Sequence, residues 1–277
     1  MPHLPRLPGY ELIESLGGGP MTCVWSAREL ATDALVAVKM PRPDWPDSTG
    51  RTLIHREARA GMAVRHPHLI HIRAACPDRP PFLVMDLLSG ESLRQRLLRD
   101  YQLDQPTAFW IARQTAEALA AMHRLHFAHG DVKPENIWLT GPGTAVLIDL
   151  GFAHRPGENA EFLDKGLILG TANYLAPELC SAENEADERA DLFALGVMLF
   201  EMLTGRLPYP SGTMTETLHS HRHDWPANLR DCPDDWSPSL RRLLRRLLAR
   251  RPADRPAAYA AAQDLVALEI ASFRRPA

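Results

Sequence analysis

The chain has 277 residues, of which 45% are hydrophobic, and a formal net charge of −3. This composition suits one large domain, or two lobes that share a cleft, and argues against a predominantly disordered chain. Because basic and acidic residues nearly cancel, no overall field points to nucleic acid as a partner. The sequence has no apolar run near the roughly 20 residues of a membrane span, and its four cysteines are far apart, as in reducing compartments. We therefore expect a cytoplasmic protein without a membrane span.

The first third of the chain predicts a small lobe rich in β-strands. Short β-branched runs alternate with turns, and one helical pattern stops where a proline disfavours helix in the residue before it. Residues 1–9 form a proline-rich tail. The elements predicted after it are strands at residues 10–16, 24–28 and 35–40, a helix at 51–65 and a strand at 81–87.

The rest of the chain predicts a larger, mostly helical lobe. Its long segments are apolar at helical spacing, and two short strands lie between the first two helices. The predicted helices cover residues 106–125, 191–203, 240–250 and 257–273, and the strands cover 137–139 and 146–150.

A glycine-rich turn and a lysine mark the small lobe. Gly17, Gly18 and Gly19 lie between two predicted strands, where glycine lets backbone N–H groups approach phosphates. A tight hairpin explains the same glycines equally well. Lys39 ends an apolar strand and needs an anionic partner if it is buried. Glu57, on the following predicted helix, is a candidate for that partner.

The strongest motif is the run from His129 to Asn136, His-Gly-Asp-Val-Lys-Pro-Glu-Asn, followed by Ile-Asp-Leu-Gly with its aspartate at position 149. Phosphoryl transfer needs a carboxylate for the hydroxyl proton, oxygen ligands for Mg²⁺ and a cation near the moving charge. These two segments supply all three. A hairpin brings Asp131, Asn136 and Asp149 to one cleft.

With these motifs in order, the chain resembles the eukaryotic-type serine/threonine protein kinases, especially the bacterial ones, from residue 10 to about 273. The resemblance implies an α+β bilobal kinase fold, with a small lobe at about 10–85, a hinge at 86–88 and a large lobe at about 89–273. It also implies ATP with Mg²⁺, or Mn²⁺ in its place, as cofactors, protein substrates, and a cognate protein phosphatase as a further partner.

The resemblance also assigns roles to single residues. Asp131 orients and deprotonates the acceptor hydroxyl, Lys133 steadies the γ-phosphoryl group, and Asn136 and Asp149 hold the metal. Lys39 contacts the α- and β-phosphates and pairs with Glu57. The residues expected around the nucleotide are Leu16, Gly17, Gly18, Gly19, Val24, Ala37, Met85 as gatekeeper, Asp86 and Leu88 in the hinge, and Trp138 beneath adenine.

Three positions depart from the family pattern. Thr22 replaces the third glycine of the nucleotide loop, and Trp138 is larger than the usual residue beneath adenine. Gly130 stands where regulated members carry an arginine that binds a phosphorylated residue. Residues 152–170 contain no serine, threonine or tyrosine. We therefore expect a kinase without the arginine before its catalytic aspartate, and without a phosphorylation switch in its activation segment.

Two other functions stay open. The His-Gly-Asp run with asparagine five residues after the aspartate also resembles small-molecule phosphotransferases such as aminoglycoside kinases, although Lys133 argues against them. The departures at Thr22, Gly130 and Trp138 suggest a pseudokinase scaffold, although every catalytic residue type is present. A face formed by Arg94, Arg96 and Arg99 hints at acidic substrates.

Overall fold

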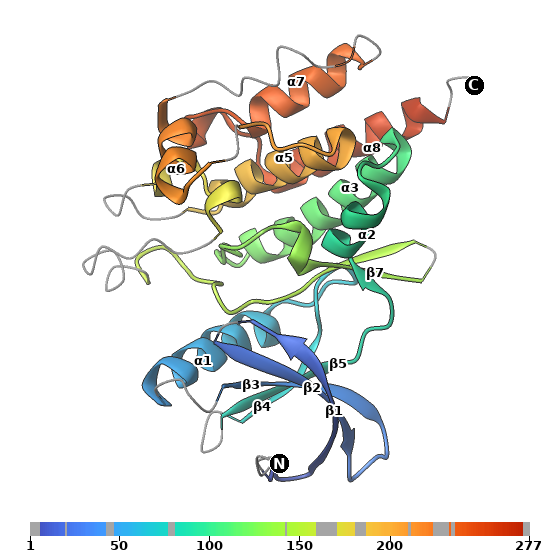
Figure 1. The fold of residues 1–277 in the computed structure, drawn as a ribbon, viewed down its shortest axis with the longest axis vertical. Coiled ribbons are helices and arrows are strands. Elements are labelled where there is room, and N and C mark those ends of the chain that lie inside the picture. The colour runs from blue at the N-terminus through green and yellow to red at the C-terminus, as the bar shows by residue number, and fades with distance from the viewer. Residues whose placement is uncertain are drawn as a thin grey trace.

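A computed structural model describes residues 6–19, 21–42, 47–76, 81–141, 143–158, 171–180, 187–209, 212–223, 233 and 236–273. Figure 1 shows two lobes, with the strands and one helix of the first part of the chain in one lobe and helices filling the other. Within these ranges, no helix is both long and apolar enough to cross a membrane.

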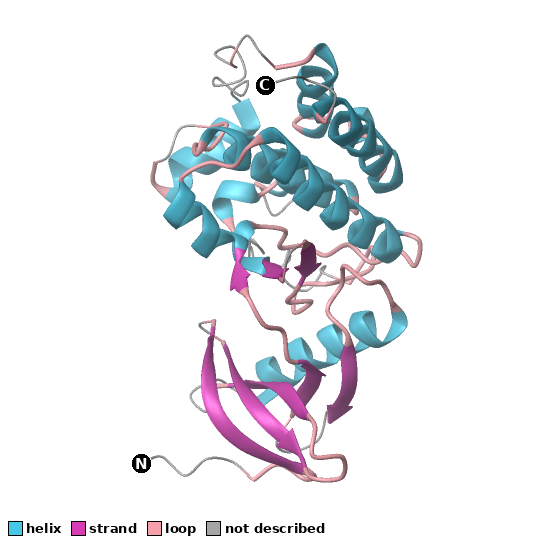
Figure 2. Ribbon diagram, turned by 90° about the vertical axis from the view of Figure 1, so that its right-hand side faces the viewer, coloured by secondary structure: helices cyan, strands magenta, loops and turns pink. Residues whose placement is uncertain are grey.

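The small lobe is an antiparallel five-stranded sheet in the order β1-β2-β3-β5-β4, with helix α1 packed against it (Figures 1 and 2). Its elements are β1 (Tyr10–Gly18), β2 (Thr22–Glu29), β3 (Leu35–Pro41), α1 (Asp47–Ala63), β4 (Ile72–Cys76) and β5 (Phe82–Asp86).

The central strand β3 explains how this sheet positions a lysine. Successive side chains of a strand point to opposite faces. Val36, Val38 and Met40 belong to the apolar cluster of the small lobe. Ala37 and Lys39 therefore point to the opposite face, toward the large lobe, and both are buried.

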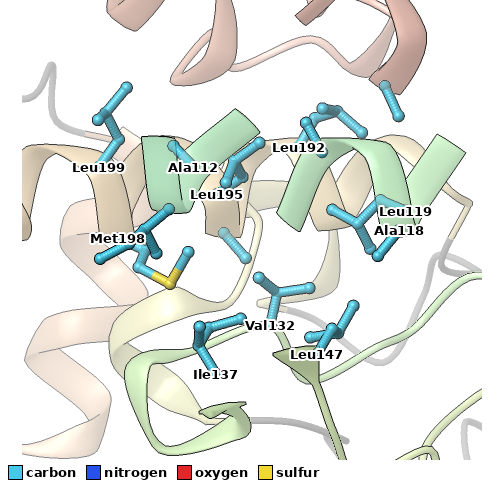
Figure 3. Close-up of a cluster of buried hydrophobic side chains, with 14 of the residues drawn as sticks. Ala112, Ala118, Leu119, Val132, Ile137, Leu147, Leu192, Leu195, Met198 and Leu199 are labelled. Carbon is cyan, nitrogen blue, oxygen red and sulfur yellow. The ribbon is translucent and has the colours of Figure 1, made fainter. Parts of the chain in front are cut away.

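The large lobe is built on two long buried helices, α3 and α5, and α8 packs along α3. Figure 3 shows Ala112 and Leu119 of α3 in one apolar cluster with Leu195 and Met198 of α5. Val132, in the loop after α3, lies beneath them. The α-helices and strands are β6 (Glu91–Ser92), α2 (Leu93–Asp100), α3 (Gln105–His123), β7 (Ile137–Thr140), β8 (Thr144–Leu147), α5 (Arg189–Thr204), α6 (Met214–His223), α7 (Pro238–Leu247) and α8 (Ala258–Ser272). The 3₁₀ turns are η1 (Pro134–Asn136), η2 (Ala172–Tyr174), η3 (Pro177–Leu179) and η5 (Pro252–Asp254).

The structure confirms the predicted helices and strands with shifted ends and adds four that the sequence analysis missed: β4, β6, α2 and α6. Helix α2 begins with a capping box, in which the Ser92 side chain accepts a hydrogen bond from Gln95 N and the Gln95 side chain accepts one from Ser92 N. This Ser-x-x-Gln spacing is a helix-start signal in the sequence. The strand predicted at residues 146–150 was placed too late, since β8 ends at Leu147 and leaves Asp149 in a loop.

Candidate active site

A cavity of about 790 Å³ lies between the two lobes. Residues of the glycine-rich turn, β3, α1 and β5 line it from the small lobe, and the segments around Asp131 and Asp149 line it from the large lobe. Of the predicted site residues, all except Gly17 line this cavity: Leu16, Gly18, Gly19, Val24, Ala37, Lys39, Glu57, Met85, Asp86, Leu88, Asp131, Lys133, Asn136, Trp138 and Asp149.

Lys39 joins the two lobes at the back of the cavity. Its Nζ lies 2.9 Å from Glu57 Oε2 on α1 and 2.6 Å from Asp149 Oδ1 in the large lobe. The side chains of Lys39 and Glu57 are 6% and 2% exposed, whereas that of Asp149 is 39% exposed. The expected ion pair of Lys39 with Glu57 is present, and it is shared with Asp149.

The charges in this cluster depend on one another. Burial opposes the Lys39 charge, but Asp149 and Glu57 together raise the Lys39 pKa above its ordinary value. Burial raises the pKa of Glu57 despite Lys39. Although burial favours a protonated Asp149, Lys39 and the Gly151 N–H hold the pKa of its carboxyl below the usual range. Asp149 is therefore an ionised carboxylate near neutral pH, as a metal ligand must be.

The backbone of Asp149 has a φ of 65°, in the left-handed region. Non-glycine residues seldom adopt this conformation, and aspartate is among the side chains that tolerate it best. Its Oδ1 accepts a hydrogen bond from Gly151 N at 3.2 Å, which fixes the carboxylate above the turn. Strain of this kind is concentrated at functional sites.

Asp131 lies at the front of the cavity with both carboxylate oxygens engaged. Thr171 Oγ1 donates a hydrogen bond to Oδ1 at 2.9 Å. Asn136 Nδ2 donates to Oδ2 at 3.0 Å, and Lys133 Nζ lies 2.6 Å from the same oxygen. Lys133 also donates to Thr171 Oγ1 at 2.7 Å. The carboxylate is therefore held in one orientation, with a lysine beside it.

The loop that carries Asp131 is hydrogen-bonded to Asp191, in the first turn of α5. Asp191 accepts hydrogen bonds from the backbone N–H groups of His129 and Gly130, at 2.8 and 2.9 Å, and its Oδ2 lies 2.9 Å from His123 Nε2. Despite burial, these partners hold the pKa of Asp191 below its ordinary value. Asp191 is therefore an ionised anchor for the loop that carries Asp131.

The glycines of the glycine-rich turn differ in how much space surrounds them. Gly18 has a φ of 149°, and a Cβ there would lie 2.3 Å from Thr22 O. A Cβ on Gly17 or Gly19 would meet nothing within 4 Å. Gly18 is therefore required by the hairpin itself, and its two neighbours leave the backbone approachable. Thr22 begins β2 and also lines the cavity.

Trp138 is one of the residues that line the cavity of about 790 Å³. Its indole Nε1 donates a hydrogen bond to Ser89 O at 3.2 Å, which ties the ring to the segment after the hinge. Trp138 pairs with Ser92 and Val146 across its sheet.

The residues present fit a nucleotide with Mg²⁺. In the described ranges, no three or more His, Cys, Asp or Glu side chains are grouped to hold a metal ion by themselves. Mg²⁺ is usually held by one or two carboxylates together with substrate phosphates and water. The Asp149 carboxylate and the Asn136 amide are side chains of the kind that such a site needs, and both line the cavity. Asn136 Nδ2 donates hydrogen bonds to Asp131 O and Oδ2.

Sequence reasoning did not assign Thr171 to the site, yet it bridges Asp131 and Lys133. Thr171 lies in a Gly-Thr-Ala-Asn-Tyr run, 40 residues from Asp131, so only the fold reveals the contact. Glu135, two residues after Lys133, also lines the cavity and was not predicted.

Comparison with known proteins gives a consistent result. The model of the protein kinase domain family matches residues 10–266. A Corynebacterium efficiens protein named "Serine/threonine-protein kinases drp72" is 30% identical over 244 residues, which are 86% of this chain and 46% of that protein. The serine/threonine-protein kinase PknD of Mycobacterium tuberculosis is 34% identical over 240 residues, 85% of this chain and 36% of PknD.

A third relative comes from another bacterial group. The serine/threonine-protein kinase PrkC of Bacillus subtilis is 29% identical over 234 residues, 83% of this chain and 35% of PrkC. The chain thus spans between about a third and a half of the length of these three relatives.

Proposed function

Since this chain belongs to the protein kinase domain family, among the eukaryotic-type serine/threonine kinases of bacteria, we propose that it transfers the γ-phosphoryl group of ATP to serine and threonine hydroxyls of proteins. The observation that carries the proposal is the pair of charged clusters that face one cavity. Lys39, Glu57 and Asp149 lie at its back, and Asp131, Lys133 and Asn136 lie at its front.

The proposed roles follow from the chemistry of these groups. Asp131 accepts the proton of the acceptor hydroxyl, because its carboxylate is fixed and faces the cavity. Lys133 stabilises the charge that develops on the moving group, and Lys39 neutralises phosphate oxygens. Asp149 and Asn136 would hold Mg²⁺ or Mn²⁺, which supplies further charge neutralisation when bound.

The nucleotide base is proposed to lie at the hinge end of the cavity. Leu16, Val24 and Ala37 supply an apolar roof, and Trp138 supplies the floor. Met85 limits the depth of the pocket. Backbone groups of residues 86–88 are the proposed hydrogen-bond partners of adenine, and these three residues are the proposed boundary between a lobe at about 10–85 and a lobe at about 89–273.

We also propose that activity does not require a phosphorylated activation segment. Besides the sequence of residues 152–170, of which 159–170 lie outside the described residues, the support is a carboxylate already in place. Glu158 Oε2 lies 2.5 Å from Arg59 Nη2 on α1, and Arg56 Nη2 donates to Glu158 O at 2.8 Å. These contacts tie α1, which carries Glu57, to the segment that follows Asp149 without a phosphate group.

The remaining partners are proposals from the family. Protein substrates are implied by the kinase relatives, and a protein phosphatase that reverses the modification is the second partner we propose. The cytoplasm stays a prediction from the sequence.

The direct test is a transfer assay with radiolabelled ATP and Mg²⁺, repeated with Mn²⁺. A generic protein acceptor and an aminoglycoside are offered separately, and Asp131→Asn is the control. We expect label on serine or threonine of the protein and a loss of about 10²–10⁴-fold in the control, the range for removal of a general base. Label on the aminoglycoside alone would assign the chain to the small-molecule phosphotransferases. Nucleotide binding without transfer would identify a pseudokinase.

A further inference from the structure

Arg94 has contacts that a solvent-exposed helix residue does not need. Its Nε donates to Glu135 Oε1 at 2.8 Å and its Nη1 to Glu201 Oε1 at 2.7 Å. Its Nη2 donates to the Tyr174 hydroxyl at 2.5 Å, and that hydroxyl donates to Glu201 Oε2. The expectation that Arg94 forms an open basic face with Arg96 and Arg99 is therefore wrong.

The other two arginines are also paired, but on the outer side of α2. Arg96 contacts Asp100, and Arg99 contacts Glu91 and Asp100. Both guanidinium groups are thus partly exposed, and each has a carboxylate partner. Arg99 is 55% exposed, whereas Arg94 is 25% exposed. Because both arginines lie on the same short helix, Arg99 serves as the control for substitutions of Arg94.

The groups around Arg94 form an acidic subsite. Glu201 is 11% exposed and Tyr174 is buried, while Glu135 is 46% exposed. Without the guanidinium, two carboxylates would face each other with little water around Glu201. Such a pair attracts a planar cation with several donors, because a guanidinium binds carboxylates with directed, charge-assisted hydrogen bonds.

This subsite lies beside the acceptor. Glu135 follows Lys133 by two residues and lines the same cavity as Asp131 and Thr171. Gln95, the neighbour of Arg94, lines it too, and the capping box at Ser92 fixes the start of α2. Because an extended peptide advances about 3.3 Å per residue, a substrate side chain a few residues from the acceptor hydroxyl reaches Glu135.

We propose that Arg94 is a specificity-determining residue, whose guanidinium fills the acidic subsite of Glu135, Glu201 and Tyr174 so that substrates with an arginine near the acceptor gain nothing from it. The proposal rests on the proposed kinase activity. It deepens it by naming a substrate class: proteins phosphorylated at sites that lack a neighbouring arginine.

The test compares Arg94→Ala with the intact chain on a set of peptides. Each peptide has one serine and one arginine, placed at each of the three positions before and after the serine, and the reference peptide has alanine there. In the intact chain we expect the ratio of kcat/KM for arginine to alanine to stay within twofold at all positions. In Arg94→Ala we expect it to rise at least tenfold at one or two positions, and Arg99→Ala should leave it unchanged.

An equal loss of kcat/KM on every peptide would overturn the proposal, because it would reduce Arg94 to a structural support. So would a tenfold arginine preference in the intact chain. Arg94→Gln is measured in parallel, in case the alanine variant unfolds. Glutamine keeps two N–H donors near Glu201. For the glutamine variant a rise of at least threefold supports the proposal, and an unchanged ratio opposes it.

A second measurement does not depend on transfer. Methylguanidinium at low millimolar concentration should raise the melting temperature of Arg94→Ala by a few degrees and leave the intact chain and Arg99→Ala unchanged. Equal responses of all three would show that the subsite takes no guanidinium and would overturn the proposal. If none of the proteins transfers phosphate while the shift appears, the kinase proposal fails and the acidic subsite stands.

Discussion

Two buried cations, Arg255 and Lys39, form ion pairs with carboxylates in different parts of the molecule. The Arg255 side chain is fully buried in the large lobe and contacts both oxygens of Glu178 at 2.6 Å. It also donates to the carbonyl oxygens of Ala249, Arg189 and Arg250, and its guanidinium lies 5.2 Å from the centre of the Phe193 ring. Lys39 contacts only Glu57 and Asp149 among the described residues, and it borders a cavity.

The difference separates a structural cation from a functional one. The directed donors of Arg255 are matched by protein acceptors, so nothing remains for a ligand. Lys39 has three N–H donors and two carboxylate partners, one of which, Asp149, is 39% exposed. A charged group that is incompletely satisfied at the edge of a cavity is therefore the better candidate for ligand binding. The pairing of Glu178 with Arg255 supports the fold rather than the chemistry.

The largest expected effect is the loss of stability when Arg255 is replaced. Replacement of Lys39 should cost less stability and should reduce activity instead. Arg255→Met removes the guanidinium that pairs with Glu178, and breaking a buried pair costs about 3–5 kcal/mol. Lys39→Met leaves Asp149 near solvent and Glu57 able to take up a proton, so we expect only about 1–3 kcal/mol of destabilisation, the cost of losing a buried hydrogen-bond partner. Denaturant unfolding measures the destabilisation of both variants. The phosphoryl-transfer assay measures the loss of activity in Lys39→Met.

The comparison also fixes the controls. Arg255→Lys keeps the charge but loses the planar fork, so it should recover only part of the stability. Nucleotide binding of refolded Arg255→Met should stay close to that of the intact chain. If Lys39→Met proved the more unstable of the two while transfer persisted, the assignment of the two cations would have to be reversed.

A second, smaller effect concerns Gly130, in the loop that Asp191 anchors. Its φ is 81°, and a Cβ there would lie 2.9 Å from Phe152 O and 3.4 Å from the His154 ring. We expect Gly130→Ala to lower the free energy of unfolding by about 1–3 kcal/mol, the left-handed backbone costing about 1–2 kcal/mol of this. Gly9 has the same φ of 81° with nothing within 4 Å of a Cβ, so Gly9→Ala measures the backbone cost alone. Equal values for the two variants would show that His154 and Phe152 leave room for a side chain.

How much of this molecule the sequence predicts depends on the range of the interaction. Lys39 and Asp149 were predictable from local patterns, because Lys39 lies in a recognisable apolar strand and Asp149 follows one. The contact of Thr171 with Asp131 and the pairing of Arg94 with Glu201 join residues 40 and 107 apart, and such pairs depend on packing that no local pattern contains.

The smallest expected effect concerns the exposed ion pair between Glu158 and Arg59. Glu158 and Arg59 are 28% and 44% exposed, and exposed pairs contribute about 0.2–1 kcal/mol. If this pair steadies α1, and with it Glu57, then Glu158→Gln should lower the rate of transfer by at most about fivefold, since 1.4 kcal/mol corresponds to tenfold. The same assay in 1 M salt should show a smaller difference, because screening weakens exposed charges.

The pH dependence of this pair has a definite sign. Although burial favours a protonated Glu158, the Arg155 N–H and Arg59 hold the pKa of its carboxyl below the ordinary value. The contribution is therefore fully present above the pKa of an unfolded glutamate, about 4.3, and is lost as the pH falls through the lower folded value. Glu158→Gln should thus differ from the intact chain at neutral pH and converge with it in acid. A double-mutant cycle with Arg59→Ala isolates the pair. A coupling of zero, with full activity in Glu158→Gln, would mean that α1 needs no tether from this segment, and the phosphorylation-independent activity would then have to rest on Gly130 and residues 159–170.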